Sequence, residues 1–321
     1  MQKLTGDQFF QFLRAEQERQ TEVARAKQME LRLMLMQYSD HSLSSSSSNA
    51  TFYVQLEGAI NSVQIPDWLQ LSELFDNNWI VPSVEIAERR KDAVQNALIK
   101  VFANFSKAFT SHRDNKEHFS KPKSLQAIDT RKYAVIDDHR PDFTLIPSQF
   151  KIENIAAIHD SSGLAFISQG FIEVKYGKLE DGHIGQLINY HYMAHKKMKH
   201  RKVFIGALTN FEQIRFVKSD FSTAGAPINY VTDVMPLFDV SNIHNIGTTY
   251  RCNTPGLKYL FSMFVDVDKS EYLFDIPEVT LVRFLGKGAT SIVYQIKRGD
   301  EEFAMKLCNS VENILHLERE I

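Results

Sequence analysis

The chain has 321 residues, of which 43% are hydrophobic and 24% are charged, and its formal net charge is −2. This composition is typical of folded soluble proteins and argues against a largely disordered or fibrous chain, and the length allows two domains with separate cores. Because the net charge is close to zero, any binding of nucleic acid has to come from a local basic patch.

Cysteine usage and the absence of targeting patterns restrict the cellular compartment. Cys252 and Cys308 are the only cysteines, which excludes a disulfide framework and a cysteine-based zinc site and suits a reducing compartment. The N-terminus lacks the pattern of a secretory signal, and no stretch approaches the roughly 18 to 20 apolar residues of a membrane span. We therefore expect the nucleus or the cytoplasm and no membrane. An effector delivered to a host without a standard signal peptide would show the same pattern.

The first 50 residues are predicted to form a helical segment followed by a linker. Residues 5–36 are rich in Gln, Glu, Arg and Leu and lack glycine after Gly6, which favours a helix. Their apolar positions do not keep a heptad register, so a docking or linker helix is favoured over a coiled coil. The run from Ser44 to Ser48 cannot bury apolar surface and indicates a flexible loop.

Residues 51–220 are predicted to form an α/β or α+β domain. Ser83 is a suitable cap for an amphipathic helix that runs to about Phe109, and residues 111–124 are expected to form an exposed basic loop. Strand patterns follow at residues 133–136, 143–146 and 170–175, then a helix at 182–199 and strands at 203–209 and 213–217. This order predicts a central sheet flanked by helices.

Residues 221–278 are interpreted as a connecting segment with a helix opened by Thr254 and Pro255. A second strand-rich unit is expected over residues 279–321. The chain is thus predicted to contain two folded units joined by this connection.

Two carboxylates and a lysine make up the main candidate site. Asp142 precedes an apolar strand, and Glu173 and Lys175 are two residues apart on another, so their side chains share one face. Two carboxylates that converge from neighbouring strands suit Mg²⁺ or Mn²⁺, with the carbonyl of Val174 as a further ligand. Such an ion lowers the pKa of bound water and neutralises phosphodiester charge, while Lys175 steadies the water or the phosphate. The alternative is a solvated Glu-x-Lys face.

The residues Pro141-Asp142 and Glu173-Val174-Lys175 resemble the signature of the PD-(D/E)XK nuclease superfamily, over about residues 84–217. The resemblance implies a restriction-endonuclease-like core, a mixed sheet and Mg²⁺-dependent endonuclease activity on DNA. Asp142 and Glu173 are 31 residues apart, which is longer than a tight hairpin and departs from the simplest form of the pattern.

A glutamine and a tyrosine on the following helix extend the resemblance. Gln186 and Tyr190 have the i,i+4 spacing of one helix face, as in the RecB-like branch of the superfamily, where such a pair packs beside the metal. The resemblance also implies an acid on the first long helix, for which Glu88 is the candidate, with Glu85 less favoured. The alternative is that Tyr190 is a core aromatic and Gln186 a surface residue.

Basic residues near the end of the same helix are candidates for binding the phosphates of the nucleic-acid backbone. The alternatives are a solvated helix end whose cations suit the helix dipole, and a nuclear localisation signal. His191 and His195 share the spacing of a zinc-protease helix, but Tyr192 replaces its glutamate, so these histidines and His183 are expected to be core or surface residues. The basic candidates are Lys178, Lys196, Lys197, Lys199, Arg201 and Lys202.

The C-terminal unit contains a glycine-rich loop and a lysine that resemble the first subdomains of eukaryotic-type protein kinases. The glycines let the backbone approach nucleotide phosphates, and the lysine would pair with those phosphates. The alternative is an unrelated β-hairpin. The positions that carry the resemblance are Gly286, Gly288, Ser291, Val293, Lys306 and Glu320.

We expect no kinase activity from residues 279–321, because the catalytic-loop His-Arg-Asp and the Asp-Phe-Gly do not occur in them. ATP binding is expected only in a longer parent protein with a lower lobe. The sheet face with Leu281, Phe284, Ile292 and Phe303 would lack its usual cover. We therefore expect this unit either to pack against the nuclease-like domain or to stay poorly ordered.

A nuclease-like domain joined to a kinase-like segment resembles the C-terminal part of Crinkler-type effector proteins. That resemblance implies a nuclear, DNA-directed role, although no Crinkler leader or NTPase domain is recognisable. The first hypothesis is a metal-dependent nuclease with DNA as substrate. The second is an inactive nuclease-fold binding module of a protein kinase whose catalytic part is missing.

Overall fold

The structure is a computed structural model, and its described residues begin at the first strand of the main sheet. The expected N-terminal helix and serine-rich linker lie outside the described residues, as do Glu85, Glu88 and Glu320. The described ranges are 60–63, 80–81, 91–114, 124–158, 163–199, 201–223, 227–238, 250–251, 254–265, 272–288 and 291–308.

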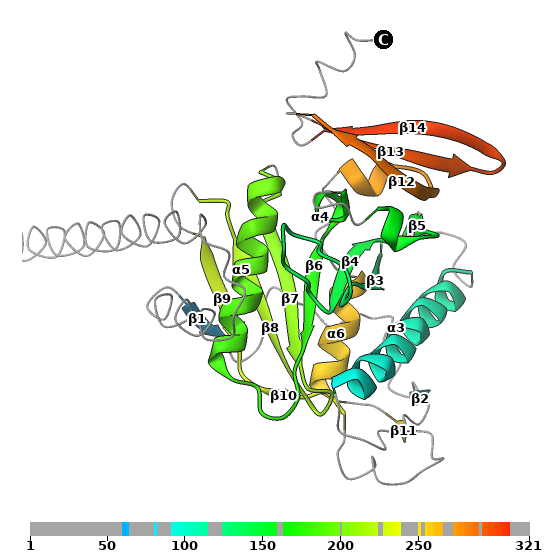
Figure 1. Ribbon diagram of the computed structural model, residues 1–321. Coiled ribbons are helices and arrows are strands. Elements are labelled where there is room, and N and C mark those ends of the chain that lie inside the picture. Colours follow the sequence, from blue (N-terminus) through cyan, green and yellow to red (C-terminus); the bar gives the residue numbers. More distant parts are fainter. Residues whose placement is uncertain are drawn as a thin grey trace, which may run out of the picture.

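A mixed sheet of eight strands forms the centre of the molecule (Figure 1). Its order is β1-β9-β8-β7-β6-β4-β3, with β10 paired to β8. The pairs β1–β9 and β6–β7 are parallel and the other neighbours are antiparallel. The predicted mixed α/β class is therefore confirmed. The strands are β1 (Ile60–Val63), β3 (Leu125–Asp129), β4 (Phe143–Pro147), β6 (Gly170–Val174), β7 (Val203–Thr209), β8 (Gln213–Asp220), β9 (Ile228–Thr232) and β10 (Met235–Pro236).

Helices cover both faces of this sheet. Helix α5 (Asp181–Lys197) packs on β6, β7 and β8, whereas α3 (Lys91–Asp114) and α6 (Pro255–Val265) pack on the opposite face. Strand β6 shows the reason, since Phe171 joins the core under α5 and Ile172 joins the core under α3 and α6. No helix in the described ranges is both long enough and apolar enough to cross a membrane.

Helix α3 is held by an apolar stripe along one side. Val94, Leu98, Val101 and Phe105 recur every three or four residues and are buried. Phe102, beside this stripe, meets Phe143 edge-to-face at 5.1 Å between ring centroids. The helix continues to Asp114, beyond the predicted end near Phe109.

An insertion between β4 and β6 explains the long spacing between the two carboxylates. It contains β5 (Phe150–Ile152), the 3₁₀ helix η2 (Ile155–Ala157) and α4 (Gly163–Ile167). Strand β5 pairs in parallel with β12 (Val279–Lys287) of the C-terminal unit. The insertion is therefore the segment to which the C-terminal unit attaches.

The C-terminal unit is a sheet in the order β14-β13-β12-β5, formed by β12 with β13 (Ser291–Arg298) and β14 (Glu301–Cys308). On β13, Ile292, Tyr294 and Ile296 are buried against the insertion and α4, and the Tyr294 hydroxyl donates a hydrogen bond to the Gly163 carbonyl. Of the two expected outcomes for this unit, packing or poor order, the described residues show packing against the main domain. The cover is partial, since Phe303 remains 46% exposed.

Several predicted elements differ in the structure. Residues 133–136 form no strand apart from one isolated bridge, Ile136 to His139, because the chain reverses at Asp137 with a left-handed φ of 50°. Strands β3 and β9 lie in segments that were not predicted to be strands. Both are five residues long and acquire their conformation by pairing with β4 and β8. The remaining elements are β2 (Ile80–Val81), β11 (Tyr250–Arg251) and η4 (Tyr272–Asp275).

Candidate functional site

Strand pairing brings the two candidate carboxylates together. Phe143 of β4 is in register with Ile172 of β6, and the next residues outward are Asp142 and Glu173. Both are almost fully buried, with 3% and 2% of their surface exposed. The ammonium of Lys91, on α3, lies 3.0 Å from Asp142 Oδ2 and 3.9 Å from Glu173 Oε1. The two carboxylates therefore converge on a single cation position.

A chain of hydrogen bonds fixes the orientation of Asp142. Its Oδ2 accepts from the Val174 backbone N–H at 2.8 Å, and its Oδ1 accepts from the side-chain amide of Gln95. The carbonyl of that amide accepts from Arg131 Nη1 at 2.9 Å. Because arginine can only donate, this bond sets which end of the Gln95 amide faces Asp142. Arg131 is in turn held by Asp129, 2.8 Å away.

A second network connects Glu173 to helix α5. Lys175 Nζ donates to Glu173 Oε1 at 2.8 Å and to Gln186 Oε1 at 2.7 Å. The amide nitrogen of Gln186 donates to Glu173 Oε1 at 3.2 Å and also contacts the Tyr190 hydroxyl. Tyr190 is buried and packs edge-to-face against His139. The four residues predicted from spacing are thus in one hydrogen-bonded group, and Tyr190 is at the same time a core aromatic.

One carboxylate oxygen is left without a partner. Glu173 Oε2 is buried and accepts no hydrogen bond from any residue that the structure describes. A buried, unsatisfied carboxylate oxygen is costly unless a cation or a donor completes it. The donor set of two carboxylates is hard and oxygen-rich, and it fits Mg²⁺ or Mn²⁺.

The structure does not test the predicted third acid. Glu88 lies outside the described residues, and within them no cluster of three or more His, Cys, Asp or Glu side chains is suited to a metal. Among the described residues, Asp142, Glu173 and the predicted Val174 carbonyl would hold the ion, together with water, as is common for Mg²⁺.

Burial and mutual repulsion perturb the ionisation of the site. Burial, and then the charge of Glu173, raise the pKa of Asp142 to about 6, against the opposing effects of Lys91 and the Val174 N–H. Burial and the charge of Glu173 raise the pKa of Tyr190 well above its usual 10, so this phenol stays protonated. Burial, followed by the charge of Lys175, lowers the pKa of His183.

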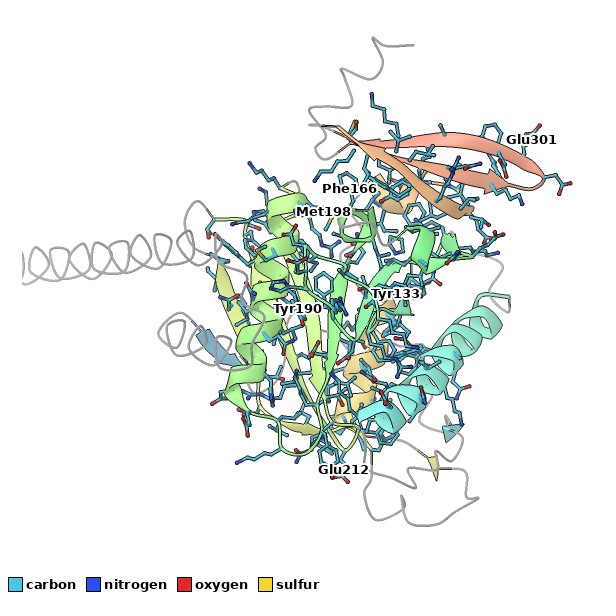
Figure 2. The ribbon with its side chains drawn as sticks, viewed as in Figure 1. Tyr133, Phe166, Tyr190, Met198, Glu212 and Glu301 are labelled. Atoms are coloured by element: carbon cyan, nitrogen blue, oxygen red, sulfur yellow. The ribbon has the colours of Figure 1, made fainter. Side chains whose placement is uncertain are left out.

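The basic candidates separate into two locations. Lys178 is exposed in the turn between β6 and α5, close to Lys175. Lys196, Lys199 and Lys202 are exposed at the far end of α5, and the 10 residues between Gln186 and Lys196 correspond to about 15 Å along the helix. Figure 2 shows Tyr190 midway along α5 and Met198 at this far end.

Two members of the predicted basic cluster are held by hydrogen bonds or an ion pair to other parts of the fold. Arg201 is 5% exposed and donates to the carbonyls of Val203 and Gln169, each at 2.9 Å. Its prediction as a surface contact to nucleic acid is therefore wrong for this structure, because its guanidinium ties the end of α5 to the sheet. Lys197 forms an ion pair with Asp137 at 2.6 Å.

The histidines behave as predicted. His191 is fully buried, and its Nδ1 lies 2.9 Å from Ser219 Oγ. His195 Nδ1 bonds to the Arg201 carbonyl, and its ring stacks on Phe221 at 4.1 Å between centroids. His183 accepts from the Glu180 backbone N–H and completes the capping box of α5. The three side chains therefore contribute to the packing and the N-terminal capping of α5.

Two of the kinase-like residues, Val293 and Lys306, lie on the side of the C-terminal sheet that faces away from the main domain, whereas Ser291 is buried. Val293 is in register with Lys306, and Lys306 is exposed, while the alternate residues of β13 are buried. Gly286 has open space around its Cα, and the Gly288 N–H bonds to the Ser291 carbonyl. Glu320, the expected partner of Lys306, lies outside the described residues.

Three residues of the site were not predicted: Lys91, Gln95 and Arg131. Lys91 and Gln95 have the i,i+4 spacing of one helix face, which was the available signal, but nothing local connects that face to Asp142. Arg131 lies in a turn after β3, a strand that was itself not predicted.

Comparisons with protein-family models, with curated proteins and with solved structures find no match to this chain.

Proposed function

We propose that this protein is a metal-dependent nuclease of the PD-(D/E)XK type that hydrolyses phosphodiester bonds in DNA. The observation that carries the proposal is the convergence of Asp142 and Glu173 on one cation position, with Lys175 bonded to Glu173 at 2.8 Å. Buried carboxylates are expensive to ionise, and a site without metal chemistry has little need for two of them side by side.

The charge balance of the site supports hydrolysis of a phosphodiester. Asp142 and Glu173 together carry two negative charges, and Lys91 and Lys175 carry two positive charges, so the group is neutral by itself. A divalent ion adds two positive charges. A phosphodiester brings one negative charge, and a further negative charge develops as water attacks it. The two positive charges of the metal-loaded site therefore offset the two negative charges of the transition state.

Each residue has a defined part in this proposal. When bound, Mg²⁺ or Mn²⁺ lowers the pKa of water and neutralises the phosphate. Asp142, Glu173 and the Val174 carbonyl hold the ion, and Lys175 orients the attacking water or the phosphate. Gln186 positions both residues, since its Oε1 accepts from Lys175 at 2.7 Å and its Nε2 donates to Glu173 at 3.2 Å. The hydroxyl of the neutral Tyr190 in turn accepts a hydrogen bond from the Gln186 amide.

The surface around the site suits nucleic acid. Tyr176 is 63% exposed directly after Lys175, and Lys178 is exposed two residues further on. An exposed aromatic ring can stack on a base and a lysine can contact a phosphate. These residues are closer to the carboxylates than the lysines at the far end of α5, so we assign them the first contacts with the substrate. Such a role is compatible with the expected location in the nucleus or the cytoplasm.

The second candidate is a metal-free binding module attached to a kinase-like segment. It is favoured by the position of Lys91, whose ammonium already neutralises the carboxylates at 3.0 and 3.9 Å. In this alternative the C-terminal sheet, which is attached through β5, would have a function only in a longer parent protein that also binds ATP. Residues 279–308 by themselves offer an open sheet face and should bind ATP with a Kd above about 100 μM in a calorimetric titration.

A plasmid-nicking assay at pH 8 with Mg²⁺, Mn²⁺ or EDTA distinguishes the two candidates. The wild-type protein should nick DNA only with a divalent ion, and Glu173→Gln should reduce the rate by about a hundredfold or more. Glu153→Gln, a substitution of an exposed residue just after β5, is the control. Equal nicking by the wild type and Glu173→Gln, or no nicking with either ion, would favour the binding module.

A further inference from the structure

Lys91 occupies the position that a divalent ion would take. Its ammonium lies between the two carboxylates, 3.0 Å from Asp142 Oδ2 and 3.9 Å from Glu173 Oε1. Lys175 also contacts Glu173, but from the side of α5 and with a second anchor on Gln186. Lys91 therefore approaches the carboxylates from α3, whereas Lys175 approaches Glu173 from the end of β6, beside α5.

The two lysines differ in how firmly they are held. The Lys175 side chain is 17% exposed and is fixed by two hydrogen bonds, whereas the Lys91 side chain is 43% exposed and contacts only the carboxylate pair in the described structure. A long, partly solvated lysine can move its ammonium into water at low cost. Lys91 is thus the cation that can leave.

We propose that Lys91 is an internal counter-ion of the carboxylate pair, which the divalent ion displaces and which then binds a phosphate of the nucleic acid. This proposal rests on the proposed function. A divalent ion and an ammonium cannot share one position, because like charges a few ångströms apart repel strongly inside a site of low dielectric. The displaced ammonium stays on α3 at the rim of the site, where the substrate phosphate has to approach.

Two consequences follow for binding. Lys91 lowers the intrinsic affinity for the metal, because the ion pair has to break first. The same residue raises the affinity for nucleic acid once the metal is bound, so metal and substrate binding become mutually supportive. A residue that served only to stabilise the fold would produce neither effect.

The experiment compares Lys91→Gln, Lys91→Arg and the wild type, with Lys100→Gln as the matched control, since Lys100 is exposed on the same helix. Mg²⁺ affinity is measured by isothermal titration calorimetry at pH 8.5, above the raised pKa of Asp142. Binding of a short DNA duplex is measured by fluorescence anisotropy in Ca²⁺ over a range of salt concentrations, so that affinity is recorded without cleavage.

Lys91→Gln should bind Mg²⁺ about tenfold more tightly than the wild type, since one charge-assisted contact no longer competes. It should also bind DNA more weakly in Ca²⁺, with a salt slope lower by about 0.9, the value for one phosphate contact. Lys91→Arg should stay within about threefold of the wild type in Mg²⁺ affinity, because it keeps the cation and because a threefold ratio is less than 1 kcal/mol.

Different outcomes identify which idea fails. An Mg²⁺ affinity that is unchanged or weaker in Lys91→Gln overturns the displacement, and an unchanged salt slope overturns the phosphate contact. Either result leaves the nuclease proposal in place if the wild type binds Mg²⁺. Absence of Mg²⁺ and Mn²⁺ binding in every variant removes the proposed function together with this inference.

Discussion

Replacement of Asp142 by asparagine should stabilise the metal-free protein. Asn has nearly the same shape and can still accept the Val174 N–H bond, but it removes a buried charge that lies beside Glu173. The pKa of Asp142 is raised from 3.8 to about 6 in the fold. At about 1.36 kcal/mol per pKa unit, ionised Asp142 costs on the order of 3 kcal/mol at neutral pH.

The net gain is smaller than this cost, because Asn cannot keep the same bond with the Gln95 amide, whereas the attraction of Lys91 is already part of the raised pKa. Subtracting about 1 to 2 kcal/mol for the mismatched amide contact leaves an expected stabilisation of about 1 to 2 kcal/mol for Asp142→Asn in EDTA at pH 8. A carboxyl group with a raised pKa contributes stability below its unfolded value of 3.8, and that contribution is lost as the pH rises through about 6. The difference between the two proteins should therefore grow between pH 4 and pH 7.

Urea unfolding in EDTA at a series of pH values measures this difference, with the exposed Asp233→Asn as the control. Mg²⁺ should reverse the order of stability, because only the wild type keeps both ligands. A hundredfold excess over the Kd adds about 2.7 kcal/mol to the protein that binds it. The reasoning is refuted if Asp142→Asn is the less stable protein in EDTA at pH 8, or if the difference does not depend on pH.

Three further predictions concern residues around the site. Arg131→Gln should weaken Mg²⁺ binding by about tenfold in calorimetry, because the Gln95 amide that orients Asp142 loses its own support; an unchanged affinity would show that this support is dispensable. Burial, and then the charge of Arg201, lower the pKa of His191 to about 3, so folding stability is full above pH 6.5 and falls as the pH decreases toward 3. At pH 5 this loss should be about 2 kcal/mol in urea unfolding, and it should be absent in His191→Gln if His191 is the cause. Joint replacement of Lys196, Lys199 and Lys202 by Gln should lower the salt slope of DNA binding by about 2 to 3 units, and an unchanged slope would assign these lysines to a solvated helix end or a nuclear address.

The parts of the site that were predicted from the sequence depend on local geometry. Glu173 and Lys175 share a face because side chains alternate along a strand, and Gln186 and Tyr190 share a face because they are one helical turn apart. Such relations hold wherever the segment is placed, so they could be recognised before the fold was known. The carboxyl group of Asp142 was predicted to join them, and the pairing of β4 with β6 places it there.

The tertiary structure decided the rest, because it depends on contacts between segments that are distant in the chain. Lys91 and Gln95 reach Asp142 only because the apolar stripe of α3 packs on the sheet, and Arg201 is buried only because its guanidinium meets the Gln169 carbonyl 32 residues away. Strands β3 and β9 likewise depend on their partners, since five residues carry too weak a pattern to define a strand alone. Residue spacing thus determined which chemistry the chain can support, and packing determined which cation lies between the two carboxylates.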